Sequence, residues 1–439
     1  APRAGAEMKV YIETYGCQMN EYDSRVIASI LANDGHGMAH DARTADVVVV
    51  NTCSVRERAE ARVLGRLRHL RGLMKKEAVL GIAGCVAQRL GDRLLREVPG
   101  LSFVVGTEQY WKLPDIIESA SAGRIVVAVD AGTGESYDDR PGPDEASLCE
   151  FVSVMRGCNN HCSYCIVPYV RGRERSRPTS SIVDEVAKLV GLGAREVTLI
   201  GQSVNSFSDE GRGFADLLDA VAGVAGLQRI RFATSHPKDL SIEVIDAVGS
   251  IDKVCEHIHL PVQSGSTEVL GTMNRSYTRE QYVALTQRIR EGIPGVALTT
   301  DIIVGFPGET DAQFHETVSL MNEMRFDSAF MFRYSVREGT RAAELADDVP
   351  EEVKVARLQT IIGLQQRVTS EMNAGLVGSS AEVLVEGPSR KNEELLFGRS
   401  RTGKVVVFPG DGGLAGRVVR VEIASASTWA LHGVNPVLS

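Results

Sequence analysis

The sequence contains no long hydrophobic run. Its clearest apolar stretches, Val47–Val50 and Ile125–Val129, have the length of a β-strand, whereas a membrane-spanning helix needs about 20 consecutive apolar residues. Residues 1–7 do not combine a charged start with an apolar core, so we expect no export signal. These absences predict a cytoplasmic protein without a membrane partner.

The chain also lacks an excess of positive charge. Its formal net charge is −9, which argues against a general affinity for nucleic acids. Two local runs are nevertheless basic, because residues 56–76 contain eight Lys or Arg and residues 171–177 contain four Arg. A solvated helix face and a charged loop would explain these runs. RNA binding is the second interpretation that they leave open.

Neither a phosphate-binding glycine loop nor a plausible Ser-His-Asp arrangement is present. The eight cysteines are the remaining source of chemistry. In a cytoplasmic protein we expect them to be free thiols, catalytic thiols or metal ligands rather than disulfides. Their positions in the predicted fold distinguish these roles.

The first part of the 439-residue chain predicts an N-terminal parallel α/β domain and a linker. Residues 8–122 alternate strand and helix signals, which is typical of βαβ units. Residues 123–147 include a run rich in Gly, Pro, Asp and Ser and are expected to be the linker. The strand candidates of the first domain are Val10–Thr14, Val47–Asn51 and Val79–Ala83.

Residues 148–375 form a second alternating series, which predicts a partial TIM-like (β/α)6 barrel. In such barrels the chemistry lies at the carboxyl ends of the strands. The strand candidates are Phe151–Arg156, Glu196–Ile200, Arg229–Ala233, Glu256–Leu260, Leu298–Val304 and Ser328–Tyr334. A long amphipathic helix is expected from Glu351 to about Asn373.

Residues 376–439 change to short strands separated by Gly, Pro and Asn turns. This pattern predicts a small β-barrel of the kind that binds oligonucleotides. The strand candidates are Ala381–Glu386, Leu395–Gly398, Lys404–Phe408 and Arg417–Ile423.

Three cysteines of the first domain each follow a predicted strand. They are Cys17, Cys53 and Cys85. Because the carboxyl ends of parallel strands lie at one edge of a sheet, where ligands bind, these thiols could meet there. The alternative is three separately buried cysteines, but burial does not explain why the same placement occurs three times.

A second triplet, Cys158-x3-Cys162-x2-Cys165, follows the first strand of the predicted barrel. The loop is too polar and too short to bury three inert thiols. A structural zinc site usually needs a fourth protein ligand, and His161 does not give the usual paired spacing. Three cysteines on a 4Fe–4S cluster leave one iron open to a substrate or cofactor.

The other candidate residues carry weaker signals. Cys149 and Cys255 lie outside both triplets and are expected to be buried or spectator thiols. His257 and His259 alternate on a predicted strand, so barrel-lining side chains are a better interpretation than a metal pair. The run 305–308, Gly-Phe-Pro-Gly, is typical of a turn that ends a strand.

The second triplet, with Tyr164 before its last cysteine, resembles the radical S-adenosylmethionine enzymes. The resemblance implies that S-adenosylmethionine binds the open iron and that reduction cleaves it to a 5′-deoxyadenosyl radical. Many such enzymes have Gly-Gly-Glu after the second barrel strand, where this chain has Gln202 between Gly201 and Ser203. We expect Gln202 to contact the cofactor instead. Ser235 and Gln263 are candidate cofactor contacts by position.

Further motifs, distributed over nearly the whole chain, resemble the methylthiotransferase family. They are TYGCQMN at 14–20, NTCSVRERAE at 51–60, GCVAQR at 84–89, HIHLPVQSGS at 257–266 and MNRSYTREQY at 273–282. The family has a methylthiotransferase domain, a radical domain and a C-terminal TRAM domain, which match the three segments. The resemblance implies that Cys17, Cys53 and Cys85 hold an auxiliary 4Fe–4S cluster. It also implies that Cys158, Cys162 and Cys165 hold the radical-generating one.

The resemblance implies methylthiolation of carbon 2 of N6-isopentenyladenosine at position 37 of tRNA. S-adenosylmethionine would supply both the radical and the methyl group, and flavodoxin or ferredoxin the electron. The TRAM domain and the basic runs would position the anticodon stem-loop. The motifs at 17–20 and 53–56 favour this substrate. Two alternative substrates are threonylcarbamoyladenosine in tRNA and an aspartate of a ribosomal protein. An alternative of another class is a non-catalytic iron–sulfur protein that binds RNA or transfers electrons.

Overall fold

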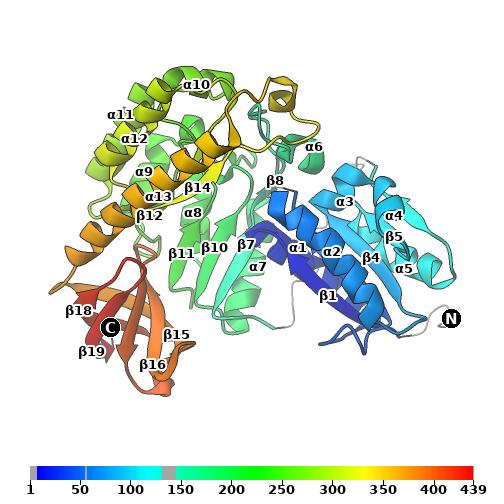
Figure 1. Cartoon of the computed structure of the whole chain (residues 1–439). Helices are drawn as coiled ribbons and strands as arrows, with labels where there is room; N and C mark the ends of the chain where they lie inside the picture. Colours follow the sequence, from blue (N-terminus) through cyan, green and yellow to red (C-terminus); the bar gives the residue numbers. More distant parts are fainter. Residues whose placement is uncertain (1–6, 55–56, 131–144, 439) are drawn as a thin grey trace.

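The structure is a computed structural model that describes residues 7–54, 57–130 and 145–438, without the side chains of residues 57–61. It contains an N-terminal α/β domain, a central partial barrel and a C-terminal β-barrel, which confirms the predicted fold class. The N-terminal and C-terminal domains lie against different parts of the central domain (Figure 1). Among the helices of these described ranges, none is both long and apolar enough to cross a membrane.

The N-terminal domain is built on a six-stranded parallel sheet with the order β2-β1-β3-β4-β5-β6. Its strands are β1 (Lys9–Tyr15), β2 (Gly37–Met38), β3 (Val47–Thr52), β4 (Val79–Gly84), β5 (Phe103–Val105) and β6 (Val126–Ala128). Strands β3 and β4 are buried along their whole length, because helices cover both faces of the sheet. Strand β6 lies inside the range predicted as a linker, where the apolar run at 125–129 completes the sheet.

Five α-helices cover this sheet. Side chains of α1 and α5 pack on one face, and side chains of α2, α3 and α4 pack on the other. The helices are α1 (Gln18–Asn33), α2 (Glu57–Leu73), α3 (Cys85–Leu90), α4 (Arg93–Glu97) and α5 (Leu113–Ser121). A 3-10 turn at Tyr110–Lys112 leads into α5.

The central domain contains six parallel strands in two sheets, β7-β10-β11 and β12-β13-β14. A parallel bridge between Ile230 and Val254 connects β11 to the segment that leads into β12, which produces the predicted partial barrel. The strands are β7 (Cys149–Ser153), β10 (Glu196–Ile200), β11 (Arg229–Phe232), β12 (His257–His259), β13 (Ala297–Val304) and β14 (Ser328–Arg333). Five of the six strand candidates are confirmed with small differences at their ends, whereas Phe151–Arg156 is divided between β7 and a separate short strand at Met155–Arg156.

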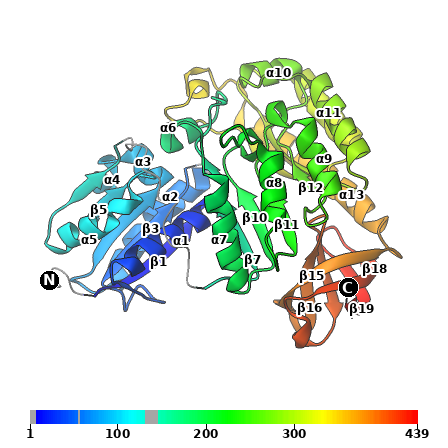
Figure 2. The same ribbon diagram turned by 180° about the vertical axis from the view of Figure 1, so that it is seen from behind.

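Helices cover the outer face of these strands, as Figure 2 shows for α7, α8 and α9. They are α7 (Thr179–Gly191), α8 (Phe214–Ala222), α9 (Ile242–Ser250), α10 (Thr267–Thr272), α11 (Arg279–Gly292), α12 (Asp311–Met324) and α13 (Glu351–Ala374). One continuous hydrophobic core joins the helices to the sheets. The sequence did not predict the short helix α6 (Val167–Arg171) or the antiparallel pair β8 (Met155–Arg156) and β9 (Arg175–Ser176).

The C-terminal domain is a closed barrel of five strands in the order β15-β16-β17-β19-β18. They are β15 (Ser380–Ser389), β16 (Asn392–Ser400), β17 (Val405–Pro409), β18 (Val418–Ala426) and β19 (Leu431–Leu438). Four of them were predicted. Strand β19 was missed because its sequence, LHGVNPVL, contains Gly, Asn and Pro, which are typical of turns.

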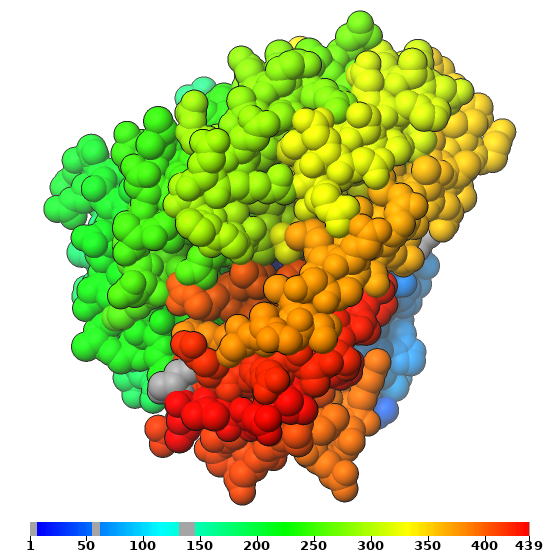
Figure 3. All heavy atoms as spheres, turned by 90° about the vertical axis from the view of Figure 1, so that its left-hand side faces the viewer, coloured from blue at the N-terminus to red at the C-terminus, as the bar shows by residue number. Residues whose placement is uncertain are grey.

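The C-terminal barrel closes the end of the central barrel at which the parallel strands begin. Arg229 donates a hydrogen bond to the carbonyl of Arg399 (2.7 Å), and Arg231 donates to the carbonyls of Ser400 (2.7 Å) and Arg401 (2.8 Å). Arg401 in turn pairs with Glu256 at 2.7 Å. In the space-filling view the C-terminal domain, coloured orange to red, lies against the central domain (Figure 3).

Candidate active site between the first two domains

The N-terminal cysteines are brought to one sheet edge by three neighbouring strands. Cys17 follows β1 and precedes α1, Cys53 follows β3, and Cys85 follows β4 as the first residue of α3. Cys53 and Cys85 are buried, whereas Cys17 is exposed. A hydrogen bond from Cys53 lowers the pKa of Cys17 to about 6, although the neighbouring protein atoms partly desolvate the thiol and act in the opposite direction. The pair therefore favours a thiolate at Cys17.

Close packing fixes the backbone around these thiols. A Cβ added at Gly16 would lie 2.2 Å from Asn20 Oδ1, and one at Gly84 would lie 2.4 Å from the carbonyl of Thr52. Gly84 also has φ +94°, which disfavours every residue with a side chain. Asn20 accepts from the N–H of Cys17 at 3.3 Å and donates to the carbonyl of Thr52 at 3.0 Å. These motif residues thus hold the cysteine turns in place.

The second triplet lies on the loop between β8 and β9. Its base is tight, because a Cβ at Gly157 (φ +78°) would lie 2.0 Å from the carbonyl of Arg173. The N–H of Cys158 donates to the carbonyl of Gly172 at 3.2 Å. Farther along, the N–H of Ser163 donates to the carbonyl of Met273 at 2.9 Å. The loop is therefore anchored to its own base and to the segment after α10.

The thiols of this loop sit in an environment that disfavours free thiolates. Burial, together with the neighbouring Cys162, raises the pKa of Cys165 to about 12. Burial also raises the pKa of Cys158. Such thiols lose their protons when a cation binds them. Three thiols without a fourth protein ligand match a 4Fe–4S cluster with one open iron.

A site for one metal ion fits less well. Within the described residues, no group of three His, Cys, Asp or Glu side chains comes together around a position for a single ion. A four-iron cluster is larger than one ion and accepts more widely spaced thiolates. The cysteine-only donor sets agree with the soft ligands that iron–sulfur clusters take.

The three predicted cofactor contacts have different surroundings. Gln202 Oε1 accepts from the N–H of Gly157 at 2.6 Å, so this side chain holds the cysteine loop. The Ser235 hydroxyl is buried and has no hydrogen-bond partner among the described residues, as expected of a group that awaits a ligand. Gln263 has φ +73°, and its N–H donates to the carbonyl of Asp301 at 2.8 Å. Contact with S-adenosylmethionine remains a prediction for all three.

Arg275 is a site residue that the sequence analysis missed. It is 8% exposed, and its charge acts on Tyr164, Cys162 and Cys165. Its guanidinium lies 5.7 Å from the centroid of the Tyr277 ring. The only sequence signal was its position in the MNRSYTREQY motif, and only the fold places a buried cation beside the second triplet.

Several arginines of the two basic runs bind protein partners, while RNA binding by these runs stays a prediction. In the second run, Arg171 pairs with Asp23 at 2.7 Å, Arg175 pairs with Glu108 at 2.6 Å, and Arg177 donates to Tyr22 at 3.2 Å. All three partners belong to the N-terminal domain. This run therefore joins two domains.

Three arginines of the first run bind acceptors of their own domain, whereas Arg56 and the side chain of Arg58 lie outside the described residues. Arg66 forms two hydrogen bonds with Glu13, at 2.7 and 3.0 Å. Arg68 donates to the carbonyl of Glu97 at 2.9 Å, and Arg71 donates to the carbonyl of Ala78 at 2.7 Å. These three arginines therefore stabilise loops of the N-terminal domain.

The remaining candidate residues lie at the opposite end of the central barrel. Cys149 begins β7, and burial raises its pKa to about 12. Cys255 is 1% exposed. His257 and His259 both lie within hydrogen-bond distance of Thr299, at 3.4 and 2.9 Å. These positions agree with spectator thiols and barrel-lining histidines.

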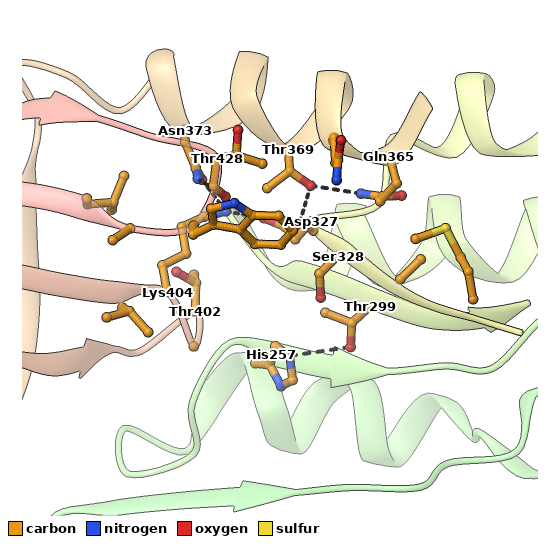
Figure 4. Close-up of a pocket in the computed structure, with 18 of the residues that line it drawn as sticks. His257, Thr299, Asp327, Ser328, Gln365, Thr369, Asn373, Thr402, Lys404 and Thr428 are labelled. Carbon is orange, nitrogen blue, oxygen red and sulfur yellow. Dashed lines mark hydrogen bonds and ion pairs between the residues drawn. The ribbon is translucent and has the colours of Figure 1, made fainter. Parts of the chain in front are cut away.

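A cavity of about 270 Å³ lies at the junction of the central and C-terminal domains. Its walls come from β12, β13, β14, α13 and the C-terminal barrel (Figure 4). Lys404 crosses the junction to Asp327 (2.8 Å) and Asn373 (3.0 Å), and Asn373 donates to the carbonyl of Ser427 at 2.9 Å. Trp429 also lines this cavity and is 75% exposed. The junction thus presents an aromatic surface beside polar groups.

Comparison with known proteins agrees with the domain order. Residues 9–106 match the uncharacterized protein family UPF0004, residues 152–321 the radical SAM superfamily, and residues 375–434 the TRAM domain. Among solved structures, the radical S-adenosylmethionine methyltransferase TsrM from Kitasatospora setae is similar with a TM-score of 0.58, 15% identity and 77% of each chain covered. This similarity shows a shared fold over 77% of the chain.

Curated relatives match almost end to end. The tRNA-2-methylthio-N(6)-dimethylallyladenosine synthase of Carboxydothermus hydrogenoformans is 46% identical over 98% of this chain and 99% of the relative. The protein of the same name from Porphyromonas gingivalis is 47% identical over 97% of this chain and 95% of the relative. Together with the two cysteine triplets on adjoining domains, these matches show that the chain belongs to the radical S-adenosylmethionine methylthiotransferase family.

Proposed function

We propose that this enzyme methylthiolates carbon 2 of N6-isopentenyladenosine at position 37 of tRNA. The observation that carries the proposal is the placement of two cysteine triplets on the facing parts of two domains, with Arg171 of the second domain donating a hydrogen bond to Cys85 of the first at 3.3 Å. A reaction that needs both a sulfur donor and a radical generator requires two such sites within reach of one base. The relatives named for this reaction support the substrate.

In this proposal each triplet binds one 4Fe–4S cluster. When bound, the cluster on Cys158, Cys162 and Cys165 would reduce S-adenosylmethionine to supply a 5′-deoxyadenosyl radical, and the cluster on Cys17, Cys53 and Cys85 would supply the sulfur. Radical chemistry suits the target, because carbon 2 of adenine is not acidic and has no leaving group. The electron would come from flavodoxin or ferredoxin, and the enzyme would act in the cytoplasm, where its tRNA is.

The protein side chains would supply electrostatics and positioning. Arg275 and Arg171 are buried cations beside the second and first triplets, and they would offset the negative charge of the thiolates. Gln202 would keep the cysteine loop in place through Gly157. The unpartnered hydroxyl of Ser235 would hydrogen-bond to S-adenosylmethionine.

Positioning of the anticodon stem-loop falls mainly to the C-terminal barrel in this proposal, because six arginines of the two basic runs bind protein partners. Trp429 is the most exposed large hydrophobic side chain among the described residues. A single-stranded base that stacks on an aromatic ring gains about 1–3 kcal/mol. We therefore assign Trp429, at the rim of the junction cavity, to an unpaired base of the anticodon loop.

The test is mass spectrometry of tRNA nucleosides from cells with and without this chain. Loss of 2-methylthio-N6-isopentenyladenosine, with accumulation of N6-isopentenyladenosine, is the expected result. Loss of methylthiolated threonylcarbamoyladenosine instead would assign the alternative tRNA substrate. An unchanged nucleoside profile, combined with loss of methylthiolation on a ribosomal-protein aspartate, would replace tRNA with a protein substrate.

A further inference from the structure

Asp23 and Arg171 form a buried ion pair across the interface of the first two domains. Asp23 on α1 is fully buried, and Arg171 at the end of α6 is 4% exposed. An Arg171 terminal nitrogen lies 2.7 Å from Asp23 Oδ2. Arg156 also lies 3.4 Å from Asp23, and the Tyr110 hydroxyl donates to Asp23 at 3.4 Å. The carboxylate thus has several partners that fix its position.

The same guanidinium reaches the first cysteine triplet. Arg171 Nε donates to Cys85 Sγ at 3.3 Å, while a terminal nitrogen of Arg171 binds Asp23. A planar guanidinium with a fixed fork of donors can hold two acceptors at once, which a lysine ammonium does less well. Since Asp23 determines the direction of the guanidinium, the carboxylate also orients the donor toward the sulfur.

Helix α6 connects this pair to the second triplet. It begins two residues after Cys165, and Ile166 and Val170 pack against Cys85. The Thr107 hydroxyl donates to the carbonyl of Val170 at 2.6 Å. One short element therefore carries the end of one cysteine loop and contacts a cysteine of the other.

We propose that Arg171, oriented by Asp23, is a positioning residue that fixes the cluster bound by Cys17, Cys53 and Cys85 relative to the second cysteine loop and raises its reduction potential. The inference rests on the proposed function, since it assumes that this triplet holds a cluster. Hydrogen bonds to cysteine sulfurs and nearby positive charge are two of the factors that set the potential of iron–sulfur clusters. Both stabilise the reduced form of the cluster, which is the more negative one, and therefore raise its reduction potential.

The test uses the full chain in a Cys158→Ala/Cys162→Ala/Cys165→Ala background, so that only the first triplet binds a cluster. After anaerobic reconstitution with iron and sulfide, iron content is measured by elemental analysis and the midpoint potential by a redox titration followed by electron paramagnetic resonance. Arg171→Met removes the donor and its charge. Arg175→Met is the matched control, because Arg175 joins the same two domains through Glu108 at 2.6 Å without contacting a cysteine.

We expect Arg171→Met to lower the midpoint potential and Arg175→Met to leave it unchanged. Arg171→Lys should lower the midpoint potential less, because lysine keeps the positive charge but loses the planar set of donors of the guanidinium. Arg171→Lys also tests the inference if Arg171→Met does not fold, because a midpoint potential equal to that of the background protein would contradict a role for the guanidinium.

Equal potentials in the Arg171→Met and Arg175→Met proteins would overturn the inference and leave the two-cluster proposal intact. A background protein that binds no iron would instead overturn the two-cluster proposal, and this inference with it.

Discussion

At the scale of single residues, the site is defined as much by buried charge as by cysteine. Arg275, Arg171 and Asp23 are all nine-tenths or more buried, and burial of a charge is costly unless it is paired. Arg171 and Asp23 pair with each other, whereas Arg275 Nε has no hydrogen-bond partner among the described residues. The cysteine pattern was predictable from spacing, but these partners come from distant parts of the sequence and are identified only by the fold.

The unpartnered hydroxyl of Ser235 leads to a prediction for cofactor affinity. Ser235→Ala should weaken S-adenosylmethionine binding by about 1 kcal/mol, the usual net worth of one hydrogen bond, while iron content stays at the parent level. Isothermal titration calorimetry measures the affinity for S-adenosylmethionine of the reconstituted parent and of the reconstituted variant. Ser250→Ala, which removes an exposed hydroxyl bonded to the carbonyl of Asp246, serves as the control. Parent affinity in Ser235→Ala would remove this hydroxyl from the cofactor site.

The two remaining cysteines provide a prediction about spectator thiols. Burial raises the pKa of both Cys149 and Cys255, so both stay protonated at neutral pH and react slowly with alkylating agents. The double variant Cys149→Ser/Cys255→Ser should keep the iron and sulfide content of the parent. Iron analysis after reconstitution is the measurement, and loss of half the iron would show that one of these thiols is a ligand.

At the scale of secondary-structure elements, the sequence predicted repeating elements better than connecting ones. The strands with continuous apolar runs, such as β3 and β4, were found because parallel buried strands have this pattern. Helix α6 was missed because five residues are too few for a helical period. Strand β19 was missed because the turn residues within it conceal the strand pattern. The omission of α6 mattered most, since this helix connects the two cysteine sites.

Helix α2 provides a test of charge interpretation at this scale. Arg66→Gln/Arg68→Gln/Arg71→Gln should leave the salt dependence of tRNA binding unchanged, because these side chains bind protein acceptors rather than phosphates. The same variant should lower the melting temperature by a few degrees, since the lost contacts are worth about 1 kcal/mol each. Filter binding at several salt concentrations and calorimetry give the two readouts. A flatter salt dependence with an unchanged melting temperature would restore the RNA-binding interpretation.

At the scale of the whole molecule, the C-terminal barrel is part of the structure of the central domain. Arg229 is 1% exposed and depends on the carbonyl of Arg399 and on Glu382, at 2.7 and 3.0 Å, for its partners. Removing the barrel breaks these contacts and uncovers the end of the central domain that the barrel closes. The sequence predicted a small RNA-binding barrel, but nothing in the sequence indicates this docking.

Deletion of residues 376–439 should therefore destabilise the central domain and reduce cluster content. Trp429→Ala should keep clusters and S-adenosylmethionine cleavage at parent levels while weakening tRNA binding by about 1–3 kcal/mol. Iron analysis and a tRNA-binding assay on the truncated protein and on Trp429→Ala separate the loss of stability from the loss of tRNA affinity. A truncated protein with full iron content and parent stability would show that the docking contacts contribute little.

The division of labour between the two triplets is the central claim, and one paired assay tests it most directly. Purified Cys17→Ala/Cys53→Ala/Cys85→Ala protein is incubated anaerobically with S-adenosylmethionine, dithionite and an isopentenylated anticodon stem-loop, and 5′-deoxyadenosine and methylthiolated product are measured together by mass spectrometry. We predict continued 5′-deoxyadenosine formation without methylthiolated product, and neither product from the Cys158→Ala/Cys162→Ala/Cys165→Ala protein. Methylthiolated product at the parent level from the first variant would contradict the claim, because the first three cysteines would then have only a structural role.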